Sequence, residues 1–159
     1  MLLNIFIASG DHAARKSTYK SIKEQNRDVY FPSLISPSAD IGILTQLEEE
    51  VMVMSNSVIG PWAKIEKFYV INTLSRVSHD CAMKDFSSLA IGVMIARASS
   101  VGFRASLIMN TSIKKITIEN DCISGVNGFV NKNLRSNGIA YGSPAISLSH
   151  QENPQDNAP

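Results

Sequence analysis

Three consecutive residues, His79-Asp80-Cys81, bring an imidazole, a carboxylate and a thiol together in the sequence. These side chains are the types that bind a metal ion or activate a nucleophile. Adjacent residues rarely converge on a single ion, and the other His and Cys residues of the chain show no spacing that would complete a ligand set. A hydrolase would need a third group, which the sequence does not identify. We therefore interpret His79-Asp80-Cys81 as part of a polar loop.

A second stretch with chemical potential is GDHAARKST, Gly10 to Thr18, which follows an apolar run. It is similar to the phosphate-binding loop G-x-x-x-x-G-K-[ST], whose backbone amides surround a phosphate. Arg15 stands where that loop has its second glycine, at a position whose backbone conformation disfavours arginine. The interpretation we favour is a helix with a basic first turn that is capped by Asp11. A nucleotide-sensing loop is the alternative.

The composition indicates one folded domain. The chain has 159 residues, 44% of them hydrophobic and 18% charged, which is enough to build a core over residues 1–148. Residues 149–159 are polar, and we expect a disordered tail there. The net charge of +1 is too small to hold nucleic acid by charge alone. No apolar run approaches the roughly 18 residues of a membrane span, and two cysteines make no disulfide framework, so we expect a cytoplasmic protein.

Helices and strands alternate along the predicted chain, which is typical of an α/β or α+β domain. We detect no internal repeat. The strongest prediction is an amphipathic helix from Phe86 to Val101, because apolar residues recur there at i, i+3, i+4 and i+7. The other expected elements are strands at 2–8, 64–71, 105–110 and 139–148 and helices at 12–25 and 125–137.

The order of elements from Lys64 to Ser147 resembles the second half of the Gcn5-related N-acetyltransferase (GNAT) fold. Val101-Gly102-Phe103 leads from the predicted helix into the next strand, as in that family. Lys67-Phe68-Tyr69-Val70 is similar to a strand end in its acyl-homoserine-lactone synthase and N-acyl amino acid synthase branch. The resemblance implies a mixed central sheet flanked by helices. It also implies transfer of an acyl group from a thioester donor to an amine.

The same resemblance implies roles for individual residues. Amine attack on a thioester needs a base and a donor to the leaving thiolate, and these roles fall to Glu66 and to Tyr141 or Tyr69. A polar, exposed strand position is the alternative interpretation of Glu66. The remaining candidates would hold the donor through the amides of Val70 and Ile71 and the side chains of Arg76 and Lys84.

Two questions stay open at the level of sequence. The implied cofactor is an acyl-coenzyme A or an acyl-carrier-protein thioester, and residues 75–84 lack the glycines that the family's pyrophosphate loop uses. A carrier-protein donor and a degenerate site are therefore both retained. The alternative function is a non-catalytic interaction or assembly protein, such as an adaptor or structural subunit of a phage, plasmid or secretion system. In that case a protein partner or a homo-oligomer is expected.

Overall fold

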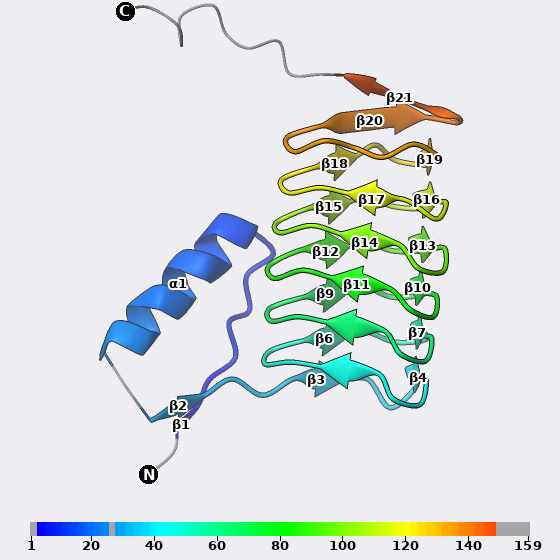
Figure 1. Ribbon diagram of the computed structural model, residues 1–159. Coiled ribbons are helices and arrows are strands. Elements are labelled where there is room, and N and C mark those ends of the chain that lie inside the picture. Colours follow the sequence, from blue (N-terminus) through cyan, green and yellow to red (C-terminus); the bar gives the residue numbers. More distant parts are fainter. Residues whose placement is uncertain (1–2, 26–27, 149–159) are drawn as a thin grey trace, which may run out of the picture.

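Most of the chain forms a parallel β-helix. A computed structural model describes residues 3–25 and 28–148. From Leu34 onward the backbone winds upward in successive coils, and each of the first five coils contributes three short strands (Figure 1). Strands of successive coils pair in parallel and in register 18 residues apart, as in Val58↔Arg76↔Met94. The last coils are shorter, with Ser100↔Thr117 and Ile123↔Ile139 as partners.

The strands of the coils lie in three sheets, which we call faces A, B and C. Their pairings are parallel except the last one, in which Ile139–Gly142 and Ala145–Leu148 pair antiparallel. Face A consists of β4 (Asp40–Ile41), β7 (Val58–Ile59), β10 (Arg76–Val77), β13 (Met94–Ile95), β16 (Ser112–Ile113) and β19 (Phe129–Val130). Face B consists of β5 (Gln46–Leu47), β8 (Lys64–Ile65), β11 (Ala82–Met83), β14 (Ser100–Val101) and β17 (Thr117–Ile118). Face C consists of β3 (Leu34–Ile35), β6 (Met52–Val53), β9 (Val70–Ile71), β12 (Ser88–Leu89), β15 (Ser106–Leu107), β18 (Ile123–Ser124), β20 (Ile139–Gly142) and β21 (Ala145–Leu148).

A period of six residues produces this fold. Every sixth residue from Ile35 to Ile113 is Ile, Leu, Val or Met, and each is the second residue of a two-residue strand. From Val53 onward these side chains are buried in a continuous core. The residue two positions before each of these is usually small. Where it is serine or threonine, its hydroxyl donates to a carbonyl of the next coil. Ser57 Oγ and Ser75 Oγ donate to Asn72 O and Ala90 O, both at 2.8 Å.

The coil turns sharply between faces, at residues with left-handed backbone angles. Corner AB contains Leu44, Trp62, Asp80 and Ala98. Corner BC contains Glu50, Phe68, Phe86, Arg104 and Asp121, and corner CA contains Asn56, Leu74, Gly92, Asn110 and Asn127. At Gly92, with φ of +71°, an added Cβ would lie 2.4 Å from Asn110 Oδ1, so the Asn110 side chain would have to move.

The N-terminal residues form a separate small unit against corner BC. Strand β1 (Leu3–Asn4) pairs in parallel with β2 (Val29–Tyr30), and α1 (His12–Gln25) lies between them in sequence and beside the coils in space (Figure 1). Tyr19 of α1 packs on Phe68, with ring centroids 4.5 Å apart, and Phe68 stacks on Phe86 at 4.8 Å. This aromatic cluster joins the two parts of the molecule.

The predicted GNAT-like α/β fold is wrong, because the described residues contain one helix and no mixed sheet flanked by helices. The helix expected from Phe86 to Val101 is instead β12, β13 and β14 on three faces. Its supposed buried stripe included Met94 and Arg97, and both are exposed. A six-residue period places apolar residues at spacings that partly coincide with those of a helix. The two patterns differ only over several turns.

Other expectations have mixed outcomes. The helix at 12–25 is confirmed with its cap, since Asp11 Oδ1 accepts the amide of Ala14 at 2.6 Å. The helix expected at 125–137 is absent and β19 lies there. The strand expected at 64–71 is divided between β8 and β9. An internal repeat exists that we did not detect. The predicted tail, residues 149–159, lies outside the described residues.

Candidate functional site

A shallow groove runs along face A and ends at corner AB. It encloses about 540 Å³, and its walls come from β7, β10, β13 and β16 with the residues that follow them. Small side chains at Gly60, Ser78 and Ala96 lie along it, one on each coil. A side chain at Gly60 would collide with the backbone of the next coil, since a Cβ there would lie 2.6 Å from His79 N. The groove spans four successive coils, from Val58 to Ile113.

His79 lies at the corner end of this groove and forms a pair with Asp80. His79 Nδ1 and Asp80 Oδ2 are 2.6 Å apart, and both side chains are partly exposed. When Nδ1–H of the neutral imidazole donates a hydrogen bond to Asp80, the lone pair of the ring is on Nε2. Within residues 3–25 and 28–148, no side chain hydrogen bonds to His79 Nε2. Cys81, in contrast, is buried, and its Sγ contacts Ala96 O at 3.3 Å.

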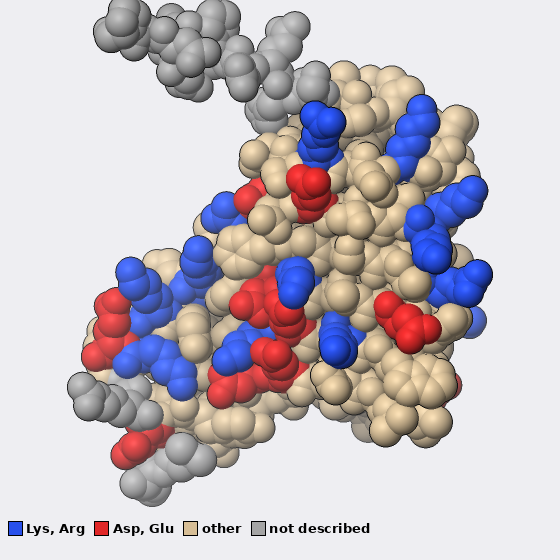
Figure 2. All heavy atoms as spheres, viewed as in Figure 1, with Lys and Arg blue, Asp and Glu red and all other residues tan. Residues whose placement is uncertain are grey.

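Corner AB changes in character along the coil axis. Ile43, Leu44 and Trp62 are exposed in the first coils, His79 and Asp80 lie in the middle, and Arg97 follows one coil later. The same edge continues into a run of exposed lysines at Lys114, Lys115 and Lys132. Lys and Arg side chains gather along the right edge of the molecule over the middle and upper coils (Figure 2). The edge thus runs from apolar to basic.

The residues proposed from sequence do not meet at one place. Arg76 alone among them lines the groove on face A. Glu66 pairs with Lys84 near corner BC. The Val70 amide donates to Ser87 O in the face C ladder, and the Ile71 side chain is buried. Tyr141 lies exposed in the last coil, whereas the hydroxyl of Tyr69 points into the core against Met83 Sδ. The roles given to these residues stay predictions.

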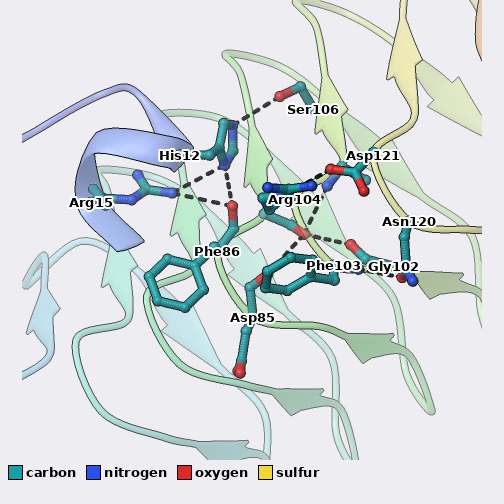
Figure 3. A network of polar contacts seen from close by, with 12 residues as sticks. His12, Arg15, Asp85, Phe86, Gly102, Phe103, Arg104, Ser106, Asn120 and Asp121 are labelled. Atoms are coloured by element: carbon teal, nitrogen blue, oxygen red, sulfur yellow. Dashed lines mark hydrogen bonds and ion pairs between the residues drawn. The ribbon is translucent and has the colours of Figure 1, made fainter. Parts of the chain in front are cut away.

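A second polar cluster fastens α1 to the coils (Figure 3). His12 Nδ1 contacts Phe86 O, and His12 Nε2 lies 2.8 Å from Ser106 Oγ and 3.1 Å from Ser88 Oγ. Burial lowers the pKa of His12, which favours the neutral imidazole. His12 Nδ1 also lies 3.3 Å from Arg15 Nη2, and all four contacts of this ring are internal. Of the two histidines in the described residues, only His79 therefore has a ring nitrogen free for a bound molecule.

A buried carboxylate lies beneath the same unit. Glu50 Oε1 accepts the amide of Ile7 at 2.8 Å, and Arg15 is buried nearby. Burial raises the pKa of Glu50 to about 7 and lowers the pKa of Arg15. Arg15 also lines a smaller cavity of about 410 Å³ between the Ser9-Gly10 turn and face C. These groups connect the N-terminal unit to the β-helix.

The described residues contain neither a cluster of metal ligands nor a membrane-spanning helix. Among residues 3–25 and 28–148, no group of three or more His, Cys, Asp or Glu side chains is placed to hold a metal ion. In the same ranges no helix has the length and apolar character needed to cross a membrane.

Comparison with known proteins adds a likeness of fold and sequence. No protein-family model matches the chain. A histidine-to-alanine variant of GDP-perosamine N-acetyltransferase from Caulobacter crescentus, in complex with CoA and GDP-perosamine, superimposes with a TM-score of 0.88 at 28% identity. PerB from Caulobacter crescentus, with the same two ligands, gives 0.88 at 29%. Each match covers 92% of this chain and 70% of the other.

A more distant structure has the same fold. The acetyltransferase domain of PglB from Neisseria gonorrhoeae, in complex with acetyl coenzyme A, superimposes with a TM-score of 0.86 at 18% identity and covers 91% of this chain and 70% of its own. These neighbours confirm the β-helix and overturn the GNAT resemblance. The sequence signal that leads to them is the apolar period of six from Ile35 to Ile113. That period places His79 at a corner of the β-helix rather than in an irregular loop.

Proposed function

We propose that this protein is an acetyltransferase that moves an acyl group from an acyl-CoA thioester to the amine of a sugar. The observation that carries the proposal is His79, which has a free Nε2 and an Asp80 partner at the end of an open groove. The likeness to the CoA-bound perosamine N-acetyltransferase supports it. Structures of that enzyme include variants in which a histidine is replaced by alanine or asparagine.

The chemistry assigned to His79 is general base catalysis. The amine nitrogen attacks the thioester carbonyl, a C–N bond forms, and the C–S bond then breaks. His79 Nε2 takes the proton that the nitrogen loses and returns it to the departing thiolate. Asp80 orients the ring and stabilises the imidazolium form that exists between the two transfers.

The groove on face A is the proposed path of the donor. Its column of small residues admits a narrow, flexible arm, and its apolar walls suit the methylene groups of pantetheine. Arg76 on β10 reaches into the same groove. Arg76 lies in the same coil as His79, at the thioester end of this path, so the phosphate-binding role predicted for it is not part of the proposal. A sugar amine would approach His79 from the solvent side of corner AB.

The test is an assay of thiol release from acetyl-CoA with GDP-perosamine as the probe acceptor. We expect turnover by the full chain and a drop in kcat of about 10²- to 10⁴-fold for His79→Asn, with an unchanged melting temperature. The matched control is the other described histidine. His12→Asn should lower the melting temperature and keep kcat below that temperature.

The outcomes separate the candidate functions. Loss of turnover in His12→Asn but not in His79→Asn would move the base to α1 and overturn the assignment. Absence of turnover with acetyl-CoA, and with an acetylated carrier protein, would favour the non-catalytic assembly protein instead. A non-catalytic assembly protein would bind a protein partner or a second copy of itself. The surface expected to make that contact contains the exposed Ile43, Leu44 and Trp62.

A further inference from the structure

The exposed basic residues on corner AB indicate where the anionic end of the acyl-CoA donor lies along the coil axis. Arg97, Lys114, Lys115 and Lys132 are all exposed. Within the ranges 3–25 and 28–148, none of them has a carboxylate within ion-pair distance, although four other Lys or Arg side chains are paired with carboxylates. Unpaired cations that gather on one edge repel each other, and an anionic ligand relieves that repulsion.

The hydrogen bonds of the coils establish that these cations follow His79 along one edge. Ala98 N donates to His79 O at 3.0 Å, which places Arg97 one coil beyond the imidazole. Ala96 N donates to Ile113 O and Lys114 N to Val130 O, both at 3.1 Å, which continues the stack through the next two coils. Corner CA, built from the same backbone turn, carries no charged residue at all.

The spacing matches the length of a phosphorylated pantetheine arm. Successive coils lie about 4.8 Å apart, so the lysines lie roughly 10–15 Å beyond His79 along the axis. From its sulfur to its first phosphorus the arm has about 13 covalent bonds, equivalent to about four extended residues or roughly 14 Å. A thioester at His79 would therefore bring the diphosphate and 3′-phosphate of CoA over the lysines.

We infer that Arg97, Lys114, Lys115 and Lys132 form the binding site for the phosphate groups of the donor. This inference rests on the proposed function and sharpens it in two respects. It orients the donor with its nucleotide end toward the last coils, so the acceptor meets His79 from the side of Trp62. It also favours free acyl-CoA over a carrier-protein thioester, because the prosthetic group of a carrier protein has one phosphodiester and lacks the 3′-phosphate.

The experiment is equilibrium binding of CoA and of 3′-dephospho-CoA to the full chain at low and moderate salt. For Lys114→Gln/Lys115→Gln we expect the Kd for CoA to rise about tenfold or more, since charge-assisted contacts are lost. The affinity of the double variant for 3′-dephospho-CoA should fall less, relative to the wild type, than its affinity for CoA. The variant should therefore bind the two ligands nearly equally. Added salt should weaken CoA binding in the wild type more than in the variant.

The control is Lys64→Gln, an exposed lysine on face B that has no ion pair among the described residues. It should bind CoA like the wild type. Equal losses in Lys64→Gln and in the double variant, or an unchanged preference for CoA over its dephospho form, would overturn the inference. The proposed function would survive that result if acetyl transfer persisted. If neither CoA nor acetyl-CoA bound or reacted, both the inference and the proposed function would fail.

Discussion

Corner AB and corner BC are built from the same backbone turn, but their side chains have different surroundings. Trp62 and Phe86 have the same φ of +57° at equivalent positions of their coils. At corner BC the aromatic rings stack on one another, α1 covers them, and Arg104 pairs with Asp121 at 2.6 Å. At corner AB the cations lack partners among the described residues and His79 faces a groove. The comparison shows that corner BC is packed and paired, whereas corner AB is exposed, and corner AB is where we propose that a ligand binds.

The largest expected contrast is between Phe86→Ala and Trp62→Ala. Phe86 is 6% exposed within the aromatic cluster, and its loss should lower the free energy of unfolding by about 3–5 kcal/mol. Trp62 is 51% exposed and should cost less than about 1 kcal/mol. Urea denaturation of both variants measures the difference. Similar losses would mean that corner AB is as much a part of the core as corner BC.

The next contrast is in pH dependence and concerns Glu50. Its folded-state pKa is raised to about 7, so ionisation of this buried carboxyl opposes folding. The stability of the wild type should therefore fall as pH rises from about 4.5 through 7, by up to about 3 kcal/mol. Glu50→Gln should remove this fall and be more stable than the wild type at pH 8.

Comparison of the two proteins isolates the effect of Glu50. The pKa of His12 is lowered, so protonation of its ring opposes folding and stability falls as the pH decreases below 6.5. His12 is present in both proteins, so this effect cancels in the comparison. Urea midpoints at pH 5 and pH 8 give the measurement. A wild-type protein that gains stability relative to Glu50→Gln as pH rises would show that Glu50 ionises normally against Arg15.

The smallest contrast tests the left-handed turns themselves. Ala98, at corner AB, has φ of +52° and no covering partner, so Ala98→Gly should raise the free energy of unfolding by about 0.5–1 kcal/mol. Arg104, at corner BC, has φ of +54°. Arg104→Gly relieves the same strain but loses the Asp121 ion pair and the contact with the Phe103 ring, so the net change should be near zero. Melting temperatures suffice for this comparison, and a loss of stability in Ala98→Gly would contradict it.

Local signals in the sequence were sufficient for α1 but not for the coils. Asp11 and the absence of breakers predict the helix correctly, because a cap and a run of helix formers act over a few residues. The apolar run from Phe86 was assigned to a helix because Leu89, Val93 and Met94 satisfy a helical spacing. The correct pattern, an apolar residue at every sixth position, becomes evident only when successive segments between Ile35 and Ile113 are aligned with one another.

The candidate site shows the same division. His79 and Asp80 were identified as reactive residues and then assigned to a polar loop, because no partner lay nearby in sequence. Arg76 was predicted to contact phosphates and does line the groove, although its role stays a prediction. Arg97 falls within the predicted helix, and no local pattern marks Arg97 or Lys114 as a site residue.

The sequence by itself determined the six-residue period, the small residues beside it and the helix from His12 to Gln25. Only the tertiary structure decided which side chains share an edge. A two-residue strand has no stability alone, and its neighbours across the sheet are 16 to 18 residues away in the chain. Stacking of the coils therefore brings His79, Arg97 and Lys114 onto one edge, where no local pattern connects them.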